Sequence, residues 1–398
     1  MKLAKVAVAA VAVIGGMLSS FGAPRYRVEM TTSGYAGSET LRNFPVLVKF
    51  AKGAPVGFDY SQFQPGQTDL SFEDASGNKL AYEIDTWDEE GASFVWVKVP
   101  ELTAETKIVA KWGDPDATTV PAERAKGAVW GAADYAAVWH FSEEDGTAFD
   151  STANGLDATP EGKDTGEMTA SVDAVVGRSR VITAASNVNS LTVPNNEKLN
   201  LGAAFTASGW FKASSMGTNG RIFERKNGSW NGAKGWETQW KGFDQVQARG
   251  ADGYNSIATI PASISSGYQQ IVFVFNDVEV ETGKCNVHLY CNGAYVGEQG
   301  PTALATDSTF ALKMMGSAYY RGTIDEFRLQ DAVASADWIK AEYDTVKSAA
   351  FYESSAVIDA GCFNTFTVET EIDAAGTLVP AAGVTTGLSD GESVSFFT

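Results

Sequence analysis

The stretch GTIDEFRLQDAVASADWIKAEYD, residues 322–344, joins a strand pattern to a helix pattern. In its first half the apolar Phe327 and Leu329 alternate with polar residues, which predicts a half-buried strand. Its second half predicts a short amphipathic helix with Ser335 as the N-cap and one apolar stripe. A strand that runs into one short helix, late in a glycine-rich chain, is typical of the closing element of a β-sandwich.

Asp325 departs from this pattern, because the alternation places it on the face of Phe327 and Leu329. A buried carboxylate without partners is energetically costly, so this one must be hydrogen-bonded, ion-paired or metal-bound. Two interpretations remain open from the sequence. Asp325 is either a ligand of a Ca²⁺ ion or an acceptor of backbone hydrogen bonds.

The composition is that of a globular protein with several domains. The chain has 398 residues, of which 44% are hydrophobic and 20% charged, and its 40 glycines and short alternating runs indicate an all-β fold. Its formal net charge is −19, and about −21 without Lys2 and Lys5 by the same counting. A surface this acidic repels phosphate backbones, so we expect no nucleic-acid partner.

The first residues have the pattern of a secretory signal peptide. Lys2 and Lys5 precede an apolar run over residues 6–18, and small residues favour cleavage after Gly22. We therefore expect residues 1–22 to be removed and the protein to be secreted, or held in the periplasm or at the cell surface. No later stretch reaches about 18 apolar residues, so no transmembrane span is expected.

The three cysteines do not form a disulfide framework. Cys285 and Cys291 lie on one face of a single predicted strand, roughly 20 Å apart at about 3.3 Å per residue, which is beyond disulfide reach. We interpret both as small buried hydrophobic residues. Cys362 is alone in the C-terminal part, and the sequence does not indicate its role.

Residues 24–112 predict a first β-rich module, followed by a linker at 113–129 that is rich in Pro, Ala, Thr and Asp. The module contains the strand patterns FPVLVKF (44–50), FVWVKV (94–99) and KIVAKW (107–112), and a hairpin in DLSFEDASGNKLAYEID (69–85). In this order these segments resemble the bacterial family known as domain of unknown function 2341. The resemblance implies an extracytoplasmic β module and no catalytic residues.

Residues 130–347 predict an antiparallel sandwich of many short strands. NVHLYCNGAYVG (286–297) is a hairpin signal, with Asn292-Gly293 between two alternating apolar runs. Together with VWHFSEEDGTAFDSTANG (138–155), FTASGWFKAS (205–214) and the opening stretch, it resembles the LamG-like, concanavalin A-like jelly roll of secreted bacterial proteins. The sequence departs from that family at Tyr268-Gln269-Gln270 and at Cys291, without a threat to the fold.

The last part, residues 348–398, predicts a β-type tail or a partial repeat. AFYESSAVID (350–359) is interpreted as a strand that returns to the sandwich. The remainder alternates Thr, Val and Phe with Gly-rich turns, and it faintly resembles the small β repeats of bacterial surface proteins.

No catalytic constellation is evident in the sequence. Hydrolases with the resembled jelly roll carry an acidic run E-x-D-x-x-E on one strand, and no carboxylates here have that spacing. His140 and His288 each lie among apolar or aromatic neighbours in predicted strands, which favours structural packing over metal binding. We therefore expect a protein that is not an enzyme.

Aromatic residues among amides and carboxylates indicate sugar binding, because pyranose rings stack on exposed aromatic faces. The segment GSWNGAKGWETQWKGFDQVQARGAD (228–252) is the densest in such residues. Trp236 and Trp240 share one strand face, which favours core packing over ligand contact, whereas Trp230 lies between Gly and Asn residues and is the best candidate for an exposed ring. The candidate ligand-binding residues are Trp230, Trp236, Trp240, Tyr254, Tyr319 and Tyr320.

The sequence predicts no cofactor, with the exception that a structural Ca²⁺ ion is compatible with it. Hard oxygen ligands gather in the acidic loop at Glu143, Asp145 and Asp150, and Asp325 meets them if the first and last strands of the jelly roll pair. The alternative is a loop of Asx turns, with Asp325 bonded to backbone.

The sequence thus predicts a secreted, non-catalytic, all-β protein that binds a polysaccharide or a cell-surface glycan or protein through its jelly roll. Two alternatives remain: an adhesive surface protein with protein partners, and an unrecognised glycoside hydrolase.

Overall fold

The computed structural model describes most of the chain between residues 23 and 360. The described ranges are 23–131, 134–162, 168–183, 190–202, 204–217, 219–226, 235–250, 253–254, 257–279, 284–303, 309–316 and 320–360. The predicted signal peptide, Cys362 and the tail beyond residue 360 lie outside these ranges. In the described ranges no helix combines the length and apolarity needed to cross a membrane.

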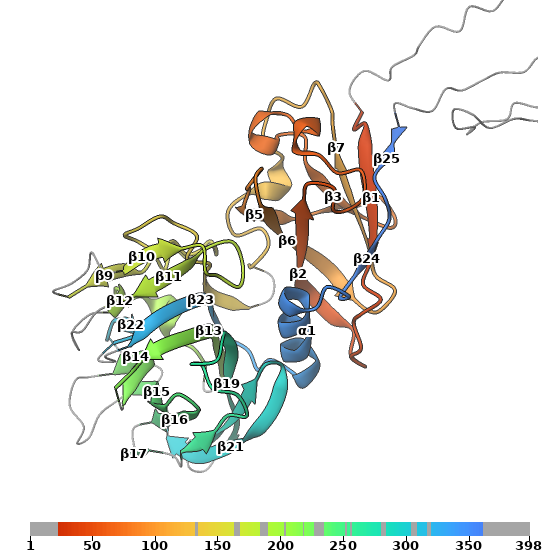
Figure 1. Cartoon of the computed structure of the whole chain (residues 1–398). Coiled ribbons are helices and arrows are strands. Elements are labelled where there is room, and N and C mark those ends of the chain that lie inside the picture. Colours follow the sequence, from red (N-terminus) through yellow and green to blue (C-terminus); the bar gives the residue numbers. More distant parts are fainter. Residues whose placement is uncertain are drawn as a thin grey trace, which may run out of the picture.

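The first domain is a sandwich of two antiparallel sheets (Figure 1). One sheet contains β1 (Tyr26–Thr31), β3 (Ser71–Asp74), β4 (Lys79–Leu80), β7 (Lys107–Trp112), β24 (Glu353–Ser354) and β25 (Ile358–Asp359). The other contains β2 (Leu41–Ala51), β5 (Tyr82–Thr86) and β6 (Ala92–Leu102). Two 3-10 turns, η1 (Tyr60–Gln62) and η2 (Pro65–Gln67), lie between β2 and β3, and a third, η3 (Ala122–Arg124), follows β7.

The strands predicted for this domain are present, and the even-spaced aromatic residues fill its core. Phe44, Phe50, Trp96 and Trp112 are fully buried. The predicted hairpin joins β3 to β4, where Asp74 accepts backbone hydrogen bonds that close the turn. The predicted linker also packs on this domain: for example, the Lys98 Nζ atom donates to the Ala128 carbonyl at 2.6 Å.

The second domain is a two-sheet jelly roll. Its first sheet contains β8 (Tyr135–Trp139), β10 (Met168–Ser171), β11 (Ser179–Ile182), β13 (Phe205–Ser215), β19 (Gln269–Glu279), β20 (Lys284–Cys291), β21 (Ala294–Ala303) and β23 (Arg321–Gln330). Its second sheet contains β9 (Thr159–Glu161), β12 (Ser190–Val193), β14 (Gly220–Lys226), β15 (Gly235–Gly242), β16 (Gln245–Gly250), β17 (Gly253–Tyr254), β18 (Ala258–Thr259) and β22 (Leu312–Met314). The turn η5 (Glu197–Leu199) lies between β12 and β13.

The hairpin β20–β21 forms as the sequence predicts. Asn292 and Gly293 both have positive φ angles, 52° and 75°, as the tight turn of a two-residue hairpin requires. Cys285 and Cys291 are buried in the jelly-roll core, in agreement with their interpretation as small hydrophobic residues.

The chain returns to the first domain after the jelly roll. The helix α1 (Ala336–Lys347) begins at the predicted N-cap, where the Ser335 side chain accepts from the Trp338 backbone. The strands β24 and β25 then pair with β1. The segment predicted to return to the jelly roll therefore completes the first domain, and the jelly roll is an insertion between two parts of that domain.

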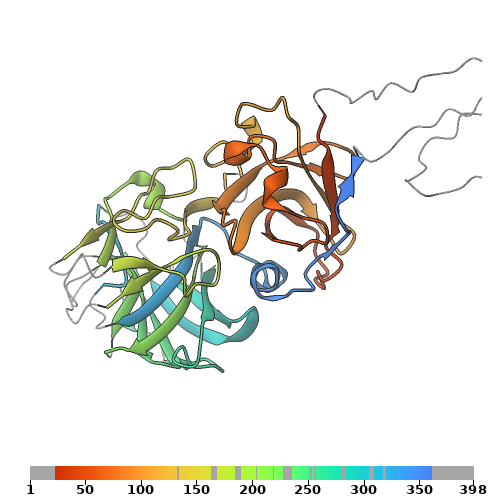
Figure 2. The same ribbon diagram turned by 45° about the horizontal axis from the view of Figure 1, so that its top comes forward.

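One outer face of the jelly roll is covered by the first domain and by α1, which lies between the two domains in Figure 2. On the first-domain side, the Trp338 and Phe44 rings pack at 4.9 Å. On the jelly-roll side, the Tyr343 and Trp210 rings stack at 5.5 Å. A single buried apolar cluster contains residues of both domains, so the two domains share a core.

The strand β23 contains a β-bulge that changes the expected orientation of Asp325. Its register with β13 shifts between the pairs Trp210–Asp325 and Ser208–Arg328, and Glu326 has a positive φ of 49°. The bulge lets Ile324, Phe327 and Leu329 all face the jelly-roll core. Asp325 therefore points away from Phe327 and Leu329, and the face assigned to it from simple alternation was wrong.

Candidate functional site

The two outer faces of the jelly roll differ in what lies against them. The face of the β13–β19–β23 sheet is turned toward the first domain (Figure 1). The β14–β15–β16 sheet lies on the opposite side of the sandwich, away from the first domain. The outer face of this second sheet is therefore the one turned away from the first domain.

The strand register aligns polar residues across that face. Lys313 on β22 pairs with Glu224 on β14. Glu224 in turn pairs with Glu237 on β15, and Glu237 pairs with Arg249 on β16. Aligned residues of a sheet share one face, so the side chains of these four residues form one line across the strands. The backbone of Tyr254 extends the row, because β17 pairs with β16 at Arg249.

These side chains bond to one another. The Arg221 Nε atom lies 2.9 Å from Glu237 Oε2 and 3.2 Å from Glu224 Oε2. The Lys226 Nζ atom lies 2.8 Å from the same Glu237 oxygen. A parallel line of amides flanks this network, where Gln239 donates from Nε2 to Gln247 at 2.7 Å. We call this set the polar face; it consists of Arg221, Glu224, Lys226, Glu237, Gln239, Gln247, Arg249 and Lys313. Five of these residues, Arg221, Glu237, Gln239, Gln247 and Arg249, are only 0–7% exposed, so the accessible part of the face lies at Glu224 and Lys313.

Three predicted sugar-stacking residues are in the core instead. Trp236 and Trp240 are 1% and 0% exposed on the inner face of β15, where Phe205 and Phe211 pack against them. Tyr320 is 1% exposed, and its hydroxyl donates to buried carbonyls. The prediction that these rings contact a ligand was wrong, because strand alternation directs Trp236 and Trp240 inward and their polar neighbours outward.

The other three aromatic candidates are not placed in full. Trp230 and Tyr319 lie outside the described residues. Only the backbone of Tyr254 is described, at the end of the polar row. These three residues remain predictions.

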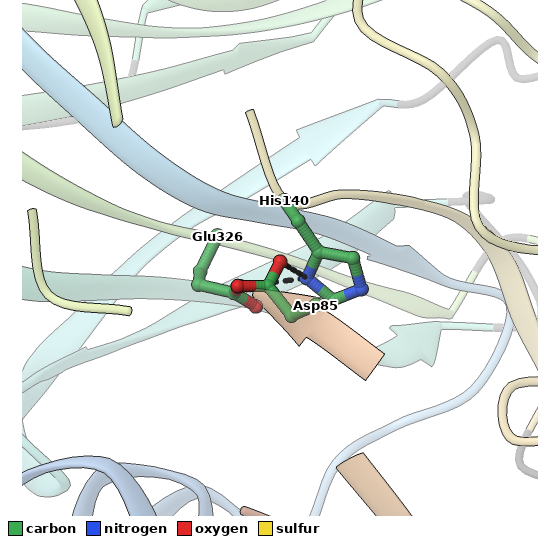
Figure 3. A group of neighbouring side chains, drawn as sticks. All are labelled: Asp85, His140 and Glu326. Carbon is green, nitrogen blue, oxygen red and sulfur yellow. Dashed lines mark hydrogen bonds and ion pairs between the residues drawn. The ribbon is translucent and has the colours of Figure 1, made fainter. Parts of the chain in front are cut away.

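A second polar cluster is buried between the two domains. Asp85 lies on β5 of the first domain, His140 follows β8 of the jelly roll, and Glu326 lies at the bulge of β23. In Figure 3 both carboxylates are directed at the same imidazole nitrogen. The His140 Nδ1 atom lies 2.6 Å from Glu326 Oε1 and 4.0 Å from Asp85 Oδ1.

Arg328 supports this cluster from the neighbouring position on β23. Its Nη2 atom lies 2.7 Å from Glu326 Oε2, and its Nη1 atom lies 3.0 Å from Glu342 Oε1. The guanidinium also lies over the rings of Trp96 and Trp130, at 4.6 Å and 5.0 Å from their centroids. Arg328 therefore links the jelly roll to the first domain and to α1.

Burial and close charges shift the pKa values of the cluster. Burial raises the pKa of Asp85 to about 7. Burial alone would lower the pKa of His140, but the facing Glu326 carboxylate outweighs it and raises the pKa to about 10. Burial likewise opposes ionisation of Glu326, and the charges of His140 and Arg328 prevail, so the pKa of Glu326 is below its usual value.

Unusual backbone conformations position two members of the cluster. Glu326 has a φ of 49°, and Phe141, directly after His140, has a φ of 62°. Such left-handed conformations cost non-glycine residues about 1–3 kcal/mol, and they are concentrated at functional sites. The Phe141 and Phe327 rings, packed edge to face at 5.2 Å, hold both turns in place.

Asp325, predicted as a Ca²⁺ ligand, is bonded to backbone. It is fully buried, and its Oδ2 atom accepts from the backbone nitrogens of Val175 and Val176 at 2.7 Å and 3.1 Å. This agrees with the alternative interpretation of a structural acid. Burial, and then the nearby charge of Glu326, hold the pKa of Asp325 well above its usual range.

The acidic loop is also organised by backbone hydrogen bonds. Asp150 is buried and accepts from the backbone of Thr152 and Leu156 at 2.9 Å each, while Glu143 accepts from that of Phe149 at 2.7 Å. Asp145 is exposed at the tip. Within the described residues, the group of three metal-type ligand atoms within 4.8 Å of one another is a different one: Asp85, His140 and Glu326.

The sequence did not indicate this group. His140 was assigned to structural packing, and its ring does pack near Trp96 and Trp130, at 6.0 Å and 5.3 Å. Asp85 and Glu326 are far from His140 in the sequence, and no local spacing pattern identifies residues that meet across two domains. The available signal was that all three lie in the segments that carry the two family resemblances.

These features define a protein of two all-β domains, a β-sandwich and a concanavalin A-like jelly roll, as the sequence predicted. The insertion of the jelly roll into the first domain was not predicted. Residues 185–340 match the concanavalin A-like lectin/glucanases superfamily. Residues 67–154 match the domain of unknown function DUF2341, so that match extends into the first strand and acidic loop of the jelly roll. Both predicted family resemblances are confirmed, in the predicted order.

The chain also resembles solved structures at low sequence identity. Domain 4 of AbnA, an extracellular GH43 arabinanase of Geobacillus stearothermophilus in complex with arabinotriose, is 17% identical, with a TM-score of 0.39 over 54% of this chain and 98% of that one. The binding domain of Paraclostridial Mosquitocidal Protein 1 is 16% identical, with a TM-score of 0.39 over 53% of this chain and 52% of that one. The chain thus spans about half of that toxin domain. No curated protein matches the chain in sequence.

Proposed function

We propose that this protein is a secreted, non-catalytic binding protein that recognises glycans through the polar face of its jelly roll. The observation that carries the proposal is the position of that face. It lies on the sheet turned away from the first domain, whereas the other outer face contributes to the core shared by the two domains. The match to a superfamily of lectins and glucanases supports a carbohydrate as the ligand.

The chemistry of the polar face suits sugar hydroxyl groups, which both donate and accept hydrogen bonds. Carboxylates, guanidinium groups and amides alternate across neighbouring strands, and rigid strands hold them in place before a ligand arrives. Such preorganisation reduces the entropy lost on binding. Lys313 and Glu224, with 41% and 19% of their side chains exposed, are accessible positions at which binding begins.

The location of the protein is part of the proposal. The basic and apolar pattern of residues 1–22 supports export, and the acidic net charge of −19 disfavours nucleic acid. The partners that we propose are therefore a polysaccharide or a glycan on a cell surface.

A glycan array with the mature chain tests the proposal. We expect binding to at least one glycan class, weakened by Trp230→Ala and by Lys313→Ala. Phe149→Ala and Lys198→Ala are matched controls, because both residues are exposed outside the polar face, and they should bind as the native chain does. No carbohydrate signal, together with capture of a surface protein, would instead support an adhesin.

A second candidate function is glycoside hydrolysis, favoured by one observation. Glu224 and Glu237 are directly opposite each other on the polar face, as neighbouring carboxylates of a glycosidase could be. Both, however, are already ion-paired with Arg221 and Lys226, and Glu237 is fully buried, which does not suit direct contact with a substrate. Release of reducing sugar by the native chain, lost in Glu237→Gln, would replace the non-catalytic proposal.

A further inference from the structure

We propose that Asp85, His140 and Glu326 form a site for one divalent metal ion of the Zn²⁺ class, which fastens the first domain to the jelly roll. The site is separate from the polar face and does not depend on the glycan proposal. Its three ligands come from β5, from the end of β8 and from β23, so one ion would join three strands that belong to two domains.

The geometry supplies the three ligand atoms. One ligand atom from each of Asp85, His140 and Glu326 lies within 4.8 Å of the other two, and His140 Nδ1 is 4.0 Å from Asp85 Oδ1 and 2.6 Å from Glu326 Oε1. The imidazole edge carrying Nδ1 faces both carboxylates (Figure 3). Atoms bonded to one metal at about 2.1 Å lie about 3 Å apart, so the ligands need only small movements to meet an ion.

Two buried polar atoms of the cluster are unsatisfied. Asp85 Oδ1 and His140 Nε2 have no hydrogen-bond partner among the residues that the structure describes. The two side chains are 1% and 4% exposed, so bulk water does not compensate for the missing partners. A buried carboxylate oxygen without a partner is costly, and a bond to a metal ion would remove that cost.

The remaining atoms of the ligands are held by neighbours, as outer-shell partners hold ligands at metal sites. Asp85 Oδ2 accepts from the Thr86 hydroxyl at 2.9 Å, and Glu326 Oε2 accepts from Arg328 at 2.7 Å. The free ring nitrogen of His140 faces Glu83, with Nε2 and Oε1 3.9 Å apart.

Glu83 is itself fixed in place. Its Oε1 atom accepts from the Ser151 hydroxyl at 2.7 Å, and its Oε2 atom accepts from the Trp130 indole nitrogen at 2.6 Å. A carboxylate held beside the distal nitrogen of a metal-bound histidine selects the tautomer that leaves the other nitrogen free to ligate.

The carboxylates around His140 also suit a cation. Asp85, Glu326 and Glu83 all face its ring, and Glu326 is also paired with Arg328. A divalent ion balances the two carboxylates that would ligate it. On binding, the ion takes the place of the proton between His140 Nδ1 and Glu326 Oε1, and that proton passes to solvent.

The ligand types define the class of metal. One imidazole nitrogen with two carboxylate oxygens suits Zn²⁺ and related first-row ions. Ca²⁺ requires about six to eight oxygen ligands, which this group does not provide.

The test uses the mature full-length chain, dialysed against chelator and titrated with Zn²⁺. We expect one equivalent to bind by calorimetry and by metal analysis, with a rise in the midpoint of thermal unfolding. Co²⁺ in place of Zn²⁺ should give a visible absorption band from its bound ligands. Asp85→Asn, His140→Gln and Glu326→Gln should each weaken binding by more than the roughly 10-fold to 100-fold caused by loss of an outer-shell partner.

Glu342→Gln is the matched control. It removes a buried carboxylate that contacts Arg328 and lies outside the ligand group, so it should keep the Co²⁺ band and the stoichiometry. Far-ultraviolet circular dichroism without metal establishes that each variant is folded. The proposal is overturned if the folded native chain binds no equivalent of Zn²⁺, or if the three ligand variants bind as tightly as Glu342→Gln.

Discussion

The ring of Phe327 fills the space directly above Gly209. A Cβ atom at Gly209 would lie 2.4 Å from Phe327 Cδ1, closer than any two carbon atoms can pack. Gly209 lies on β13 directly beside the point at which the bulge of β23 inserts its extra residue. The absence of a side chain on β13 therefore permits the bulge that directs Glu326 at His140.

Gly209→Ala should destabilise the protein by about 1–3 kcal/mol, because the new methyl group displaces the Phe327 ring. Urea unfolding measures the effect. Gly297→Ala is the matched control on β21, where an added Cβ meets no atom within 4 Å, and it should have little effect. Equal stability of the two variants would contradict this account of the bulge.

Arg328→Met should cost about 3–5 kcal/mol in metal-free buffer, because it leaves Glu326 and Glu342 buried without their shared cation. Adding Glu342→Gln to this variant removes one uncompensated charge, so the double variant should regain part of the loss. A double-mutant cycle from chemical denaturation measures the coupling. Additive effects would show that the two side chains do not interact energetically.

Trp338→Ala should lower stability by about 3–5 kcal/mol, because this side chain is 8% exposed and packs between α1 and the first domain. Limited proteolysis should also cut the variant faster near the domain boundary. Phe149→Ala, with 56% of the residue exposed, is the aromatic control and should resist protease as the native chain does. An unchanged cleavage rate in Trp338→Ala would mean that α1 does not hold the domains together.

Glu73 should give a pH-dependent contribution to stability. Burial opposes its ionisation, but Lys111 and Lys79 outweigh burial and hold the pKa of Glu73 below its usual value of 4.5. A depressed folded-state pKa stabilises the protein above the unfolded pKa, and the contribution is lost as the pH falls through the folded value. Glu73→Gln should therefore cost about 1 kcal/mol at pH 7 and progressively less toward pH 3.

Denaturant unfolding of native chain and variant across this pH range measures that difference. Glu101→Gln is the control, since its partner Arg42 and Glu101 itself have 75% and 57% of their side chains exposed. A cost for Glu73→Gln that is constant with pH would contradict the assignment.

Local sequence patterns were sufficient for the strands, the hairpins and the closing helix. The turn at Asn292 and Gly293 and the N-cap at Ser335 depend on residues close together in the chain, so propensity and alternation identify them. The same alternation was misleading at Asp325. The bulge adds one residue to β23, so the residues before it point to the face opposite to the one that alternation predicts. Alternation also cannot tell which face of β15 is the core, and so Trp236 and Trp240 were candidates for a ligand.

Periodicity and local motifs were enough to establish the all-β class, the order of the two domains and their family resemblances. Three features became visible only in the folded chain: residues 353–359 complete the first domain, the polar face is the outer face turned away from it, and Asp85 meets His140 and Glu326. The physical reason is the same in each case. These contacts join residues 50 to more than 300 positions apart, and they are stabilised by strand pairing, burial and charge pairing between distant segments, which no local pattern records.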